Sequence, residues 1–211
     1  MSRNIDEAGG IRENKNRLRS RIAVEERQIS PVRRKLCDEA LTQRLLDLQS
    51  FRQAKTVLLF SPFGAEPRLE GVFEACHISG KRLILPRMLP GNMLECREVC
   101  DPEHLVAGKY GIQEPDQTCP SVRRDDIEFI LVPAVCYDRQ GGRLGRGAGY
   151  YDRFLTGYAG KTAGLCRSCF LQEKLPLEEH DICVQIVITE CETIFCGGRR
   201  EMLNRCTWKE D

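Results

Sequence analysis

The sequence predicts an α/β fold with a doubly wound, mostly parallel sheet and helices on both faces, built as a single domain. Short apolar runs alternate along the chain with longer helix-forming segments, an order typical of parallel strands joined by helices. The run IEFILVPAV, residues 127–135, is apolar almost throughout, as expected of a strand in the middle of such a sheet. A length of 211 residues suits one sizeable core, and the sequence contains no internal repeat.

The start of the chain predicts two helices before any strand. Residues 1–10 are expected to be disordered, and residues 11–28 to form a charged, mildly amphipathic helix. Ser30 followed by Pro31 gives a helix N-cap with proline at the first helical position, so a second helix should extend to about residue 48. The expected order after that is strand 56–60, helix 67–79, strand 82–86, strand 92–99, loop 110–120, strand 127–135, a helix from Tyr150, strand 161–166 and strand 184–190.

Composition and charge exclude several classes of function. Charged residues make up 30% of the chain, but the formal net charge of +1 provides no field that would favour nucleic acid or an anionic membrane. The first residues lack the apolar stretch of a secretory leader, and no segment is apolar over the length of a membrane span. We therefore expect a cytoplasmic protein with no nucleic-acid partner and no membrane partner.

The twelve cysteines do not resemble a disulfide framework, because they are scattered through apolar runs, where free cysteine packs as a small hydrophobe. Cys166 and Cys169 have CxxC spacing, and Cys96 and Cys100 also lie close in sequence. Neither pair is accompanied by a second CxxC or a nearby histidine, as a convincing zinc site requires. Buried or incidental thiols are the favoured interpretation over metal or redox chemistry.

The segment GGRLGRGAGYYDRFL, residues 141–155, concentrates glycine and arginine directly after the central strand. In open α/β sheets ligands bind beyond the carboxyl ends of the strands, where this segment should lie. Glycines at alternate positions allow consecutive backbone amides to face an anion at the start of a helix, and arginines add forked donors suited to phosphate oxygens. The residues that predict a phosphate site are Arg143, Gly145, Arg146, Gly147 and Gly149.

The spacing matches neither common phosphate loop. A Walker loop needs Lys-Ser/Thr after its last glycine, where this chain has Ala148-Gly149, and the third glycine of a dinucleotide fingerprint would fall one place early. Asp152 would repel a polyphosphate unless a divalent cation such as Mg²⁺ lies between them. The alternative is a flexible surface loop with Asp152 at the start of a helix, where the dipole favours it. The pattern favours a nucleotide phosphate over this alternative.

The same segment resembles the signature of the 5-formyltetrahydrofolate cyclo-ligase family, also called methenyltetrahydrofolate synthetases. The family pattern, Arg-Leu-Gly-x-Gly-x-Gly-Tyr-Tyr-Asp after a Val-Pro strand end, runs unbroken here from Arg143 to Asp152. Other segments resemble the family in the same order, namely KNRLR with Lys15 and Arg19, FSPFGAEPRLE with Phe60 and Glu66, YGIQEP, and EEHDICVQIVITE with Asp181. Because the resemblance covers about residues 13–190, we expect a cyclo-ligase-like domain over 11–190 and a C-terminal extension over 191–211.

The resemblance implies conversion of 5-formyltetrahydrofolate to 5,10-methenyltetrahydrofolate with ATP and Mg²⁺, releasing ADP and phosphate. It implies catalytic roles for Arg146 and Tyr151 and metal binding by Asp152 and Asp181. The ATP-binding residues that it implies are Lys15, Arg19, Arg143, Leu144, Gly145, Arg146, Gly147, Ala148, Gly149, Tyr150 and Tyr151. The folate-binding residues that it implies are Phe60, Glu66, Arg146, Gly147, Ala148, Gly149 and Tyr150.

Several of these roles depend on the resemblance alone. Without it, Lys15 and Arg19 would be assigned to a solvated basic helix face, Glu66 to a loop, and Asp181 equally well to a turn. The chain also departs from the family, because Gln185 stands where relatives often carry a second acid, and Ala148 where some carry lysine.

Two other hypotheses stay open alongside the cyclo-ligase. One is an ATP-dependent paralogue that acts on a different formyl or carboxyl compound. The other is a nucleic-acid or metal-binding module, for which the Arg-Gly tract is short and the cysteine spacing unsuitable. The leading hypothesis is a monomeric enzyme acting on a reduced folate.

Overall fold

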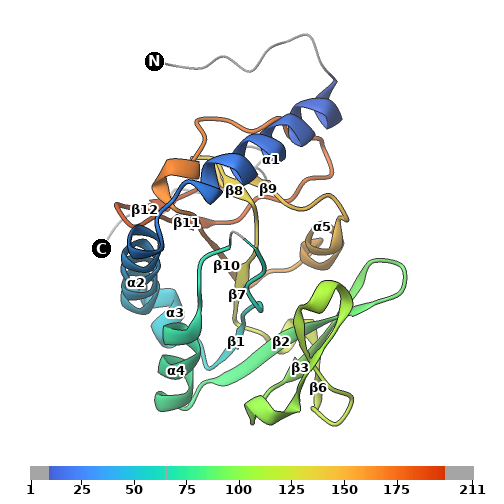
Figure 1. Cartoon of the computed structure of the whole chain (residues 1–211). Helices are drawn as coiled ribbons and strands as arrows, with labels where there is room; N and C mark the ends of the chain where they lie inside the picture. Colours follow the sequence, from blue (N-terminus) through green and yellow to red (C-terminus); the bar gives the residue numbers. More distant parts are fainter. Residues whose placement is uncertain (1–9, 65, 198–211) are drawn as a thin grey trace.

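Residues 10–64 and 66–197 are described by the computed structural model shown in Figure 1. Apart from Gly10, the segment expected to be disordered lies outside the described residues. The helices are α1 (Ile11–Arg27), α2 (Pro31–Asp47), α3 (Gln49–Gln53), α4 (Glu70–Ile78) and α5 (Tyr150–Leu155). The strands are β1 (Thr56–Leu58), β2 (Arg82–Leu89), β3 (Met93–Glu98), β4 (Leu105–Ala107), β5 (Gln113–Pro115), β6 (Ser121–Val122), β7 (Phe129–Val132), β8 (Cys136–Tyr137), β9 (Arg143–Leu144), β10 (Lys161–Leu165), β11 (Ile186–Ile188) and β12 (Thr193–Phe195).

The main sheet has eight strands in the order β12-β11-β10-β7-β1-β2-β3-β6. The five strands from β11 to β2 are parallel. At one edge β12 pairs antiparallel with β11, and at the other β3 pairs antiparallel with both β2 and β6. Val57 of β1 pairs with Leu83 of β2 on one side and with Phe129 of β7 on the other. The chain thus moves from β1 to β2, returns to the opposite side of β1 at β7, and continues outward through β10. Strand order therefore reverses between β1 and β7, which makes the carboxyl ends of these strands the switch point of the sheet.

Helices cover both faces of the sheet, which confirms the predicted fold class (Figure 1). Successive residues of β7 point to opposite sides, so Phe129 and Leu131 belong to one apolar cluster and Ile130 and Val132 to another. The first cluster packs against α2, α3 and α4, and the second against α1 and α5. Burial on both faces explains why the sequence of β7 is apolar without alternation.

The helix start at Ser30 is confirmed, because the Ser30 hydroxyl accepts a hydrogen bond from the Arg33 backbone amide at 3.3 Å and Pro31 begins α2. The central strand is shorter than the 127–135 that the sequence predicts. It ends before Pro133, which has no backbone N–H to donate to a neighbouring strand. In the described part of the chain, no helix is long and apolar enough to cross a membrane.

Several short strands were not predicted, among them β6 at the edge of the main sheet. β8 and β9 form a hairpin where a loop was expected, with Tyr137 opposite Arg143, so the glycine-arginine segment begins on a strand. β4 and β5 pair within the turn-rich region that includes 110–120. β12 pairs with β11, so the sheet continues past residue 190 into the segment assigned to a C-terminal extension.

Candidate active site

A cavity of about 560 Å³ lies beyond the carboxyl ends of β1 and β7, at the switch point of the sheet. Its floor includes Phe60 and Ser61, which follow β1, and Pro133 and Ala134, which follow β7. Every residue that the sequence analysis assigned to a nucleotide, folate, metal or catalytic site lines this one cavity. Residues that are up to 166 positions apart in sequence, such as Lys15 and Asp181, are thereby brought together.

The loop from Gly145 to Gly149 forms part of the cavity wall between β9 and α5. Gly147 and Gly149 have φ angles of +97° and +70°, which strain any residue with a side chain. Three side chains hold the carbonyl groups of the loop: Arg19 Nε donates to Gly145 O at 2.8 Å, Asn92 Nδ2 to Ala148 O at 3.1 Å, and Arg153 Nη1 to Gly149 O at 3.0 Å. The carbonyls are therefore anchored from outside the loop.

The backbone amides of the same loop differ from its carbonyls. Within the described part of the chain, no residue accepts a hydrogen bond from the backbone N–H groups of residues 145–149. Consecutive unpaired amides beside a cavity form a concave site for an anion. Helix α5 has only six residues, so we attribute this property to the loop itself rather than to a helix dipole.

Helix α1 brings two cations to the cavity one helical turn apart. Lys15 is buried, and its Nζ lies 2.6 Å from Asp181 Oδ2 and 2.8 Å from Glu178 Oε2. Burial alone would lower the pKa of Lys15, but the hydrogen bonds and charges of the two carboxylates outweigh it and raise the pKa. Lys15 is therefore charged, and the two carboxylates balance its charge. Arg19 instead donates hydrogen bonds to two neutral acceptors, a loop carbonyl and the Asn16 side chain.

Asp152 does not cap a helix but forms an ion pair. Its Oδ1 accepts a hydrogen bond from Arg143 Nη2 at 2.6 Å and another from the Ile182 backbone amide at 3.2 Å. Because Ile182 follows Asp181, these bonds bring the segments of the two predicted metal ligands side by side. Arg143 is itself buried, and its Nε has no hydrogen-bond partner among the described residues. A buried guanidinium with an unused donor is suited to a phosphate oxygen.

Three residues near Lys15 could hold a metal ion. Glu178, His180 and Asp181 place one potential ligand atom each within 4.8 Å of one another, and Asp152 is not part of this group. Two carboxylates suit a hard cation such as Mg²⁺, whereas the imidazole of His180 does not. Burial opposes ionisation of Asp181, but hydrogen bonds from Lys15 and the Glu178 amide outweigh it, so the pKa of Asp181 lies below its usual value. Asp181 is thus ionised and able to bind a cation.

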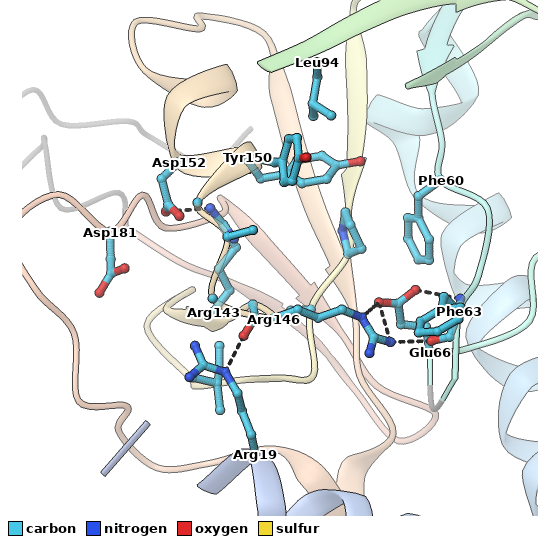
Figure 2. Close-up of a pocket in the computed structure, with 18 of the residues that line it drawn as sticks. Arg19, Phe60, Phe63, Glu66, Leu94, Arg143, Arg146, Tyr150, Asp152 and Asp181 are labelled. Carbon is cyan, nitrogen blue, oxygen red and sulfur yellow. Dashed lines mark hydrogen bonds and ion pairs between the residues drawn. The ribbon is translucent and has the colours of Figure 1, made fainter. Parts of the chain in front are cut away.

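The opposite wall of the cavity is built around Arg146 and Glu66 (Figure 2). Arg146 Nε donates to Glu66 Oε1 at 3.2 Å, and its guanidinium lies 4.7 Å from the centre of the Phe63 ring. The other carboxylate oxygen of Glu66 accepts a hydrogen bond from the Phe63 backbone amide at 2.9 Å. Burial raises the pKa of Glu66 despite these two favourable contacts. Figure 2 shows Phe60 on the same side, away from Asp152 and Asp181.

This wall continues as an apolar surface that the sequence did not reveal. Residues of the β2–β3 hairpin and of the β4–β5 segment complete it, and they are Pro86, Met88, Leu94, Ile112 and Glu114. Tyr150 and Tyr151 line the cavity between the two ends, and the Tyr151 hydroxyl oxygen is buried without a hydrogen-bond partner among the described residues. The sequence signals for this wall were the segments RLILPR, NMLECRE and YGIQEP, which resembled the family but suggested no role.

The two cysteines of the CxxC sequence differ in their surroundings. Eleven cysteines lie in the described part of the chain, and no disulfide joins any of them; Cys166 is buried and Cys169 exposed. None of the described cysteines belongs to a cluster of three metal-ligating side chains. Burial raises the pKa of Cys166 to about 12, so this thiol is unreactive at neutral pH.

The fold and the cavity together define a doubly wound α/β protein with a ligand site at the switch point of its sheet. The site is rich in ionic groups and free amides at one end and apolar at the other. A model of the 5-formyltetrahydrofolate cyclo-ligase family matches residues 11–190. The chain therefore belongs to the 5-formyltetrahydrofolate cyclo-ligase family, and it is an enzyme of that family.

Individual relatives agree with this assignment. The chain is 33% identical over 187 residues to the 5-formyltetrahydrofolate cyclo-ligase of Mycolicibacterium smegmatis, covering 83% of this chain and 93% of that protein. It is 31% identical to the enzyme of that name from Escherichia coli, with 80% and 96% covered. The NMR structure of Aquifex aeolicus 5,10-methenyltetrahydrofolate synthetase superposes with a TM-score of 0.77 at 33% identity, covering 93% of this chain and 96% of that chain. A Mycoplasma pneumoniae 5,10-methenyltetrahydrofolate synthetase, at 22% identity and a TM-score of 0.69, shares the fold.

Proposed function

We propose that the protein converts 5-formyltetrahydrofolate to 5,10-methenyltetrahydrofolate in a reaction that consumes ATP, requires Mg²⁺ and releases ADP and phosphate. The names of the relatives support the folate reaction. The observation that carries the ATP requirement is the row of unpaired amides from Gly145 to Gly149, which lies in the same cavity as the apolar wall. One cavity thus offers a site for phosphates next to a site for a flat ring.

The phosphates of ATP would lie against residues 145–149, where Gly145, Gly147 and Gly149 have no side chain to cover the amides. Arg143 would donate through its unused Nε, and Arg19 is close enough to the loop that a Cβ at Gly147 would lie 3.5 Å from Arg19 Nη2. Arginine forks match phosphate oxygens in geometry as well as in charge. Lys15 adds positive charge next to Asp181 on the same side.

The residues present fit a magnesium ion. Asp181 would hold it, with Glu178 beside it. Asp152, whose Oδ1 accepts a hydrogen bond from the Ile182 amide next to Asp181, would bind from the adjacent segment, and all three supply the oxygen ligands that Mg²⁺ prefers. A bound Mg²⁺ would neutralise part of the phosphate charge and so relieve repulsion from these carboxylates. Lys15 occupies two of the carboxylate oxygens, so we expect it to shift toward the phosphates when the metal binds.

The pteridine ring of the folate would lie against Phe60 and the aromatic side of Tyr150, with Glu66 facing the ring and Arg146 close to the formyl group. Large apolar pockets with a few fixed polar groups are typical of sites for flat ligands. Arg146 belongs to the glycine loop and reaches Glu66 on the opposite wall, so it lies between the two proposed ligands.

An amide oxygen is a poor leaving group, and phosphorylation makes it a good one. In the proposed reaction the formyl oxygen takes the γ-phosphoryl group and ADP is released. N10 then attacks the formyl carbon, the carbon–oxygen bond breaks to release phosphate, and N10 loses its proton. Arg146 would stabilise negative charge on the transferred group, and the unpaired hydroxyl of Tyr151 would donate a hydrogen bond to it. The protein thus contributes mainly positioning and charge stabilisation.

We also propose that the enzyme acts as a cytoplasmic monomer, with neither nucleic acid nor membrane as a partner. Two observations support this. The net charge of +1 gives no general attraction for polyanions. All of the residues assigned to the reaction line a cavity within one chain, so the site needs no second subunit.

The experiment that tests the proposed function follows folate conversion and ADP release in one reaction. Freshly reduced protein should turn 5-formyltetrahydrofolate into a product that absorbs in the near ultraviolet, with one ADP released for each product formed. Omission of either ATP or Mg²⁺ should abolish conversion. Absence of conversion, or conversion without ADP, would refute the proposal.

A further inference from the structure

Glu114 is the second buried carboxylate of the cavity, and nothing in the proposed reaction uses it. It lies on β5 and is 5% exposed, and like Ile112, two residues earlier, it lines the apolar wall. Gly108 packs so closely on it that a Cβ at that glycine would lie 2.3 Å from the Glu114 carboxyl carbon. The side chain is therefore fixed in place by its own hairpin.

The two oxygens of this carboxylate differ. Oε2 accepts a hydrogen bond from the Met88 backbone amide at 3.4 Å, and the Lys109 amide also stabilises the carboxylate. Oε1 is buried and has no hydrogen-bond partner among the described residues. Arg87 contributes a favourable charge to the carboxylate. A buried carboxylate oxygen without a partner is destabilising, and a bound ligand that donates a hydrogen bond would supply the missing partner.

Glu66 differs from Glu114 in this respect. Both of its oxygens already have partners within the protein, Arg146 and the Phe63 amide. Of the two buried carboxylates in the cavity, Glu114 is the one with an unused acceptor. The surfaces of Pro86, Met88, Leu94 and Ile112 around it would cover a flat ring, but they offer that ring no side-chain hydrogen bond.

We propose that Glu114 is a ligand-recognition residue whose Oε1 accepts an N–H hydrogen bond from the amino-pyrimidinone edge of the bound pteridine. This inference depends on the proposed function, because the reduced folate supplies the donor. The amino group and ring N–H of that edge are the kind of neutral donor that an acceptor in an apolar wall selects. A ring without them would leave Oε1 buried and unpaired, so the ligand lacking the donor would be rejected.

The variant Glu114→Gln tests this assignment sharply. The backbone amides at Oε2 require an acceptor, so the amide oxygen of glutamine must face Met88 and its NH₂ group must take the place of Oε1. An acceptor that faces the ligand is then replaced by a donor, while the size of the side chain is unchanged. Glu98→Gln is the matched control, because Glu98 lies on β3, pairs with Arg82 and does not line the cavity.

We expect Glu114→Gln to raise the KM for 5-formyltetrahydrofolate about ten-fold or more, the loss expected for a hydrogen bond to a charged group, with the KM for ATP unchanged. Glu98→Gln should leave both constants as in the wild type. A folate with methyl in place of the 2-amino group should bind the wild type about ten-fold more weakly, and should lose nothing further in the variant. If Glu114 had only a structural role, Glu114→Gln would leave the ratio of the affinities for the two folates as it is in the wild type.

An unchanged folate KM in Glu114→Gln, or equal loss with the methyl analogue in variant and wild type, would overturn the assignment while leaving the proposed function intact. If the variant does not fold, the proposal is tested by the binding of the two folates to the wild type. Equal binding of the natural folate and the methyl analogue would reject it. If the wild type converts no folate, the proposed function fails and this inference fails with it.

Discussion

Arg146 and Glu66 connect the two walls of the cavity, with Arg146 Nε donating to Glu66 Oε1 at 3.2 Å across 80 residues of sequence. The glycine loop and the turn after β1 are thereby held at a fixed separation. Glu66 is 8% exposed, and burial raises its pKa. Because folding raises this pKa, protonated Glu66 contributes stability that is complete at pH values below its usual pKa of 4.5. That contribution is lost as the pH rises through the pKa of Glu66 in the folded protein, so the ionised form of Glu66 lowers stability.

This relationship predicts that Glu66→Gln separates activity from stability. The neutral amide avoids the burial of a charge, so the melting temperature at pH 7 should be at least that of the wild type. Turnover should fall at least about ten-fold, because Arg146 loses the charged partner that orients it. Thermal unfolding and initial rates measure the two effects, with Glu70→Gln on the exposed start of α4 as the control. A variant that is both less stable and fully active would show that Glu66 serves only the fold.

The loop glycines predict that an effect on ATP binding can be separated from an effect on stability. Gly147 and Gly157 both have positive φ angles, +97° and +74°, so alanine at either position should cost about 1–2 kcal/mol of stability. At Gly157 nothing lies within 4 Å of the added Cβ, whereas at Gly147 the Cβ enters the proposed phosphate site beside Arg19. We expect Gly147→Ala to raise the KM for ATP about ten-fold and Gly157→Ala to leave it unchanged. Equal effects of the two variants on the KM for ATP would argue against phosphate binding by this loop.

Replacement of Asp152 should change how the reaction rate depends on the Mg²⁺ concentration. Its Oδ1 is used by Arg143 and the Ile182 amide, so replacement with asparagine loses the ion pair and a proposed metal ligand while keeping a similar shape. Asp152→Asn should reduce kcat at least about ten-fold and raise the Mg²⁺ concentration needed for half-maximal rate. Asp126→Asn, which removes an exposed pair with Arg123, is the control. Unaltered Mg²⁺ dependence in Asp152→Asn would restrict Asp152 to positioning Arg143.

Lys15 and Asp181 predict how stability depends on pH. The pKa of Asp181 is below its usual 3.8 and that of Lys15 above its usual 10.5, so their pairing stabilises the fold fully between these values. Asp181→Asn should lower the free energy of unfolding by roughly 2 kcal/mol at pH 7, and the difference should shrink as pH falls below 4. Urea unfolding measured from pH 3 to 7 tests this, with the exposed neighbour Glu179→Gln as the control. A difference that does not depend on pH would mean that charge is not the cause.

The parts of the site that the sequence predicted are those with a local pattern. The glycine-arginine loop is continuous in sequence, and Lys15 and Arg19 share a helix face because they are four residues apart. The alternation of apolar runs and helices likewise predicted the parallel sheet and the central position of β7.

The remaining parts depend on contacts between distant segments. Glu178 reaches Lys15 over 163 residues, and Asn92 holds Ala148 only because the β2–β3 hairpin lies beside the glycine loop. Glu114 gives no local signal, since its burial follows from the packing of β5 onto β2. Pairing between non-consecutive elements decides such contacts, and hydrophobic periodicity does not specify it.

The most direct test of phosphate binding by bare main-chain amides is an NMR titration with a non-hydrolysable ATP analogue and Mg²⁺. We predict that the backbone ¹⁵N–H resonances of Gly145, Gly147 and Gly149 shift most, whereas those of Gly80 and Gly157, which do not line the cavity, stay in place. Large shifts elsewhere in the protein, with these three glycine signals unmoved at saturation, would contradict the proposed nucleotide site.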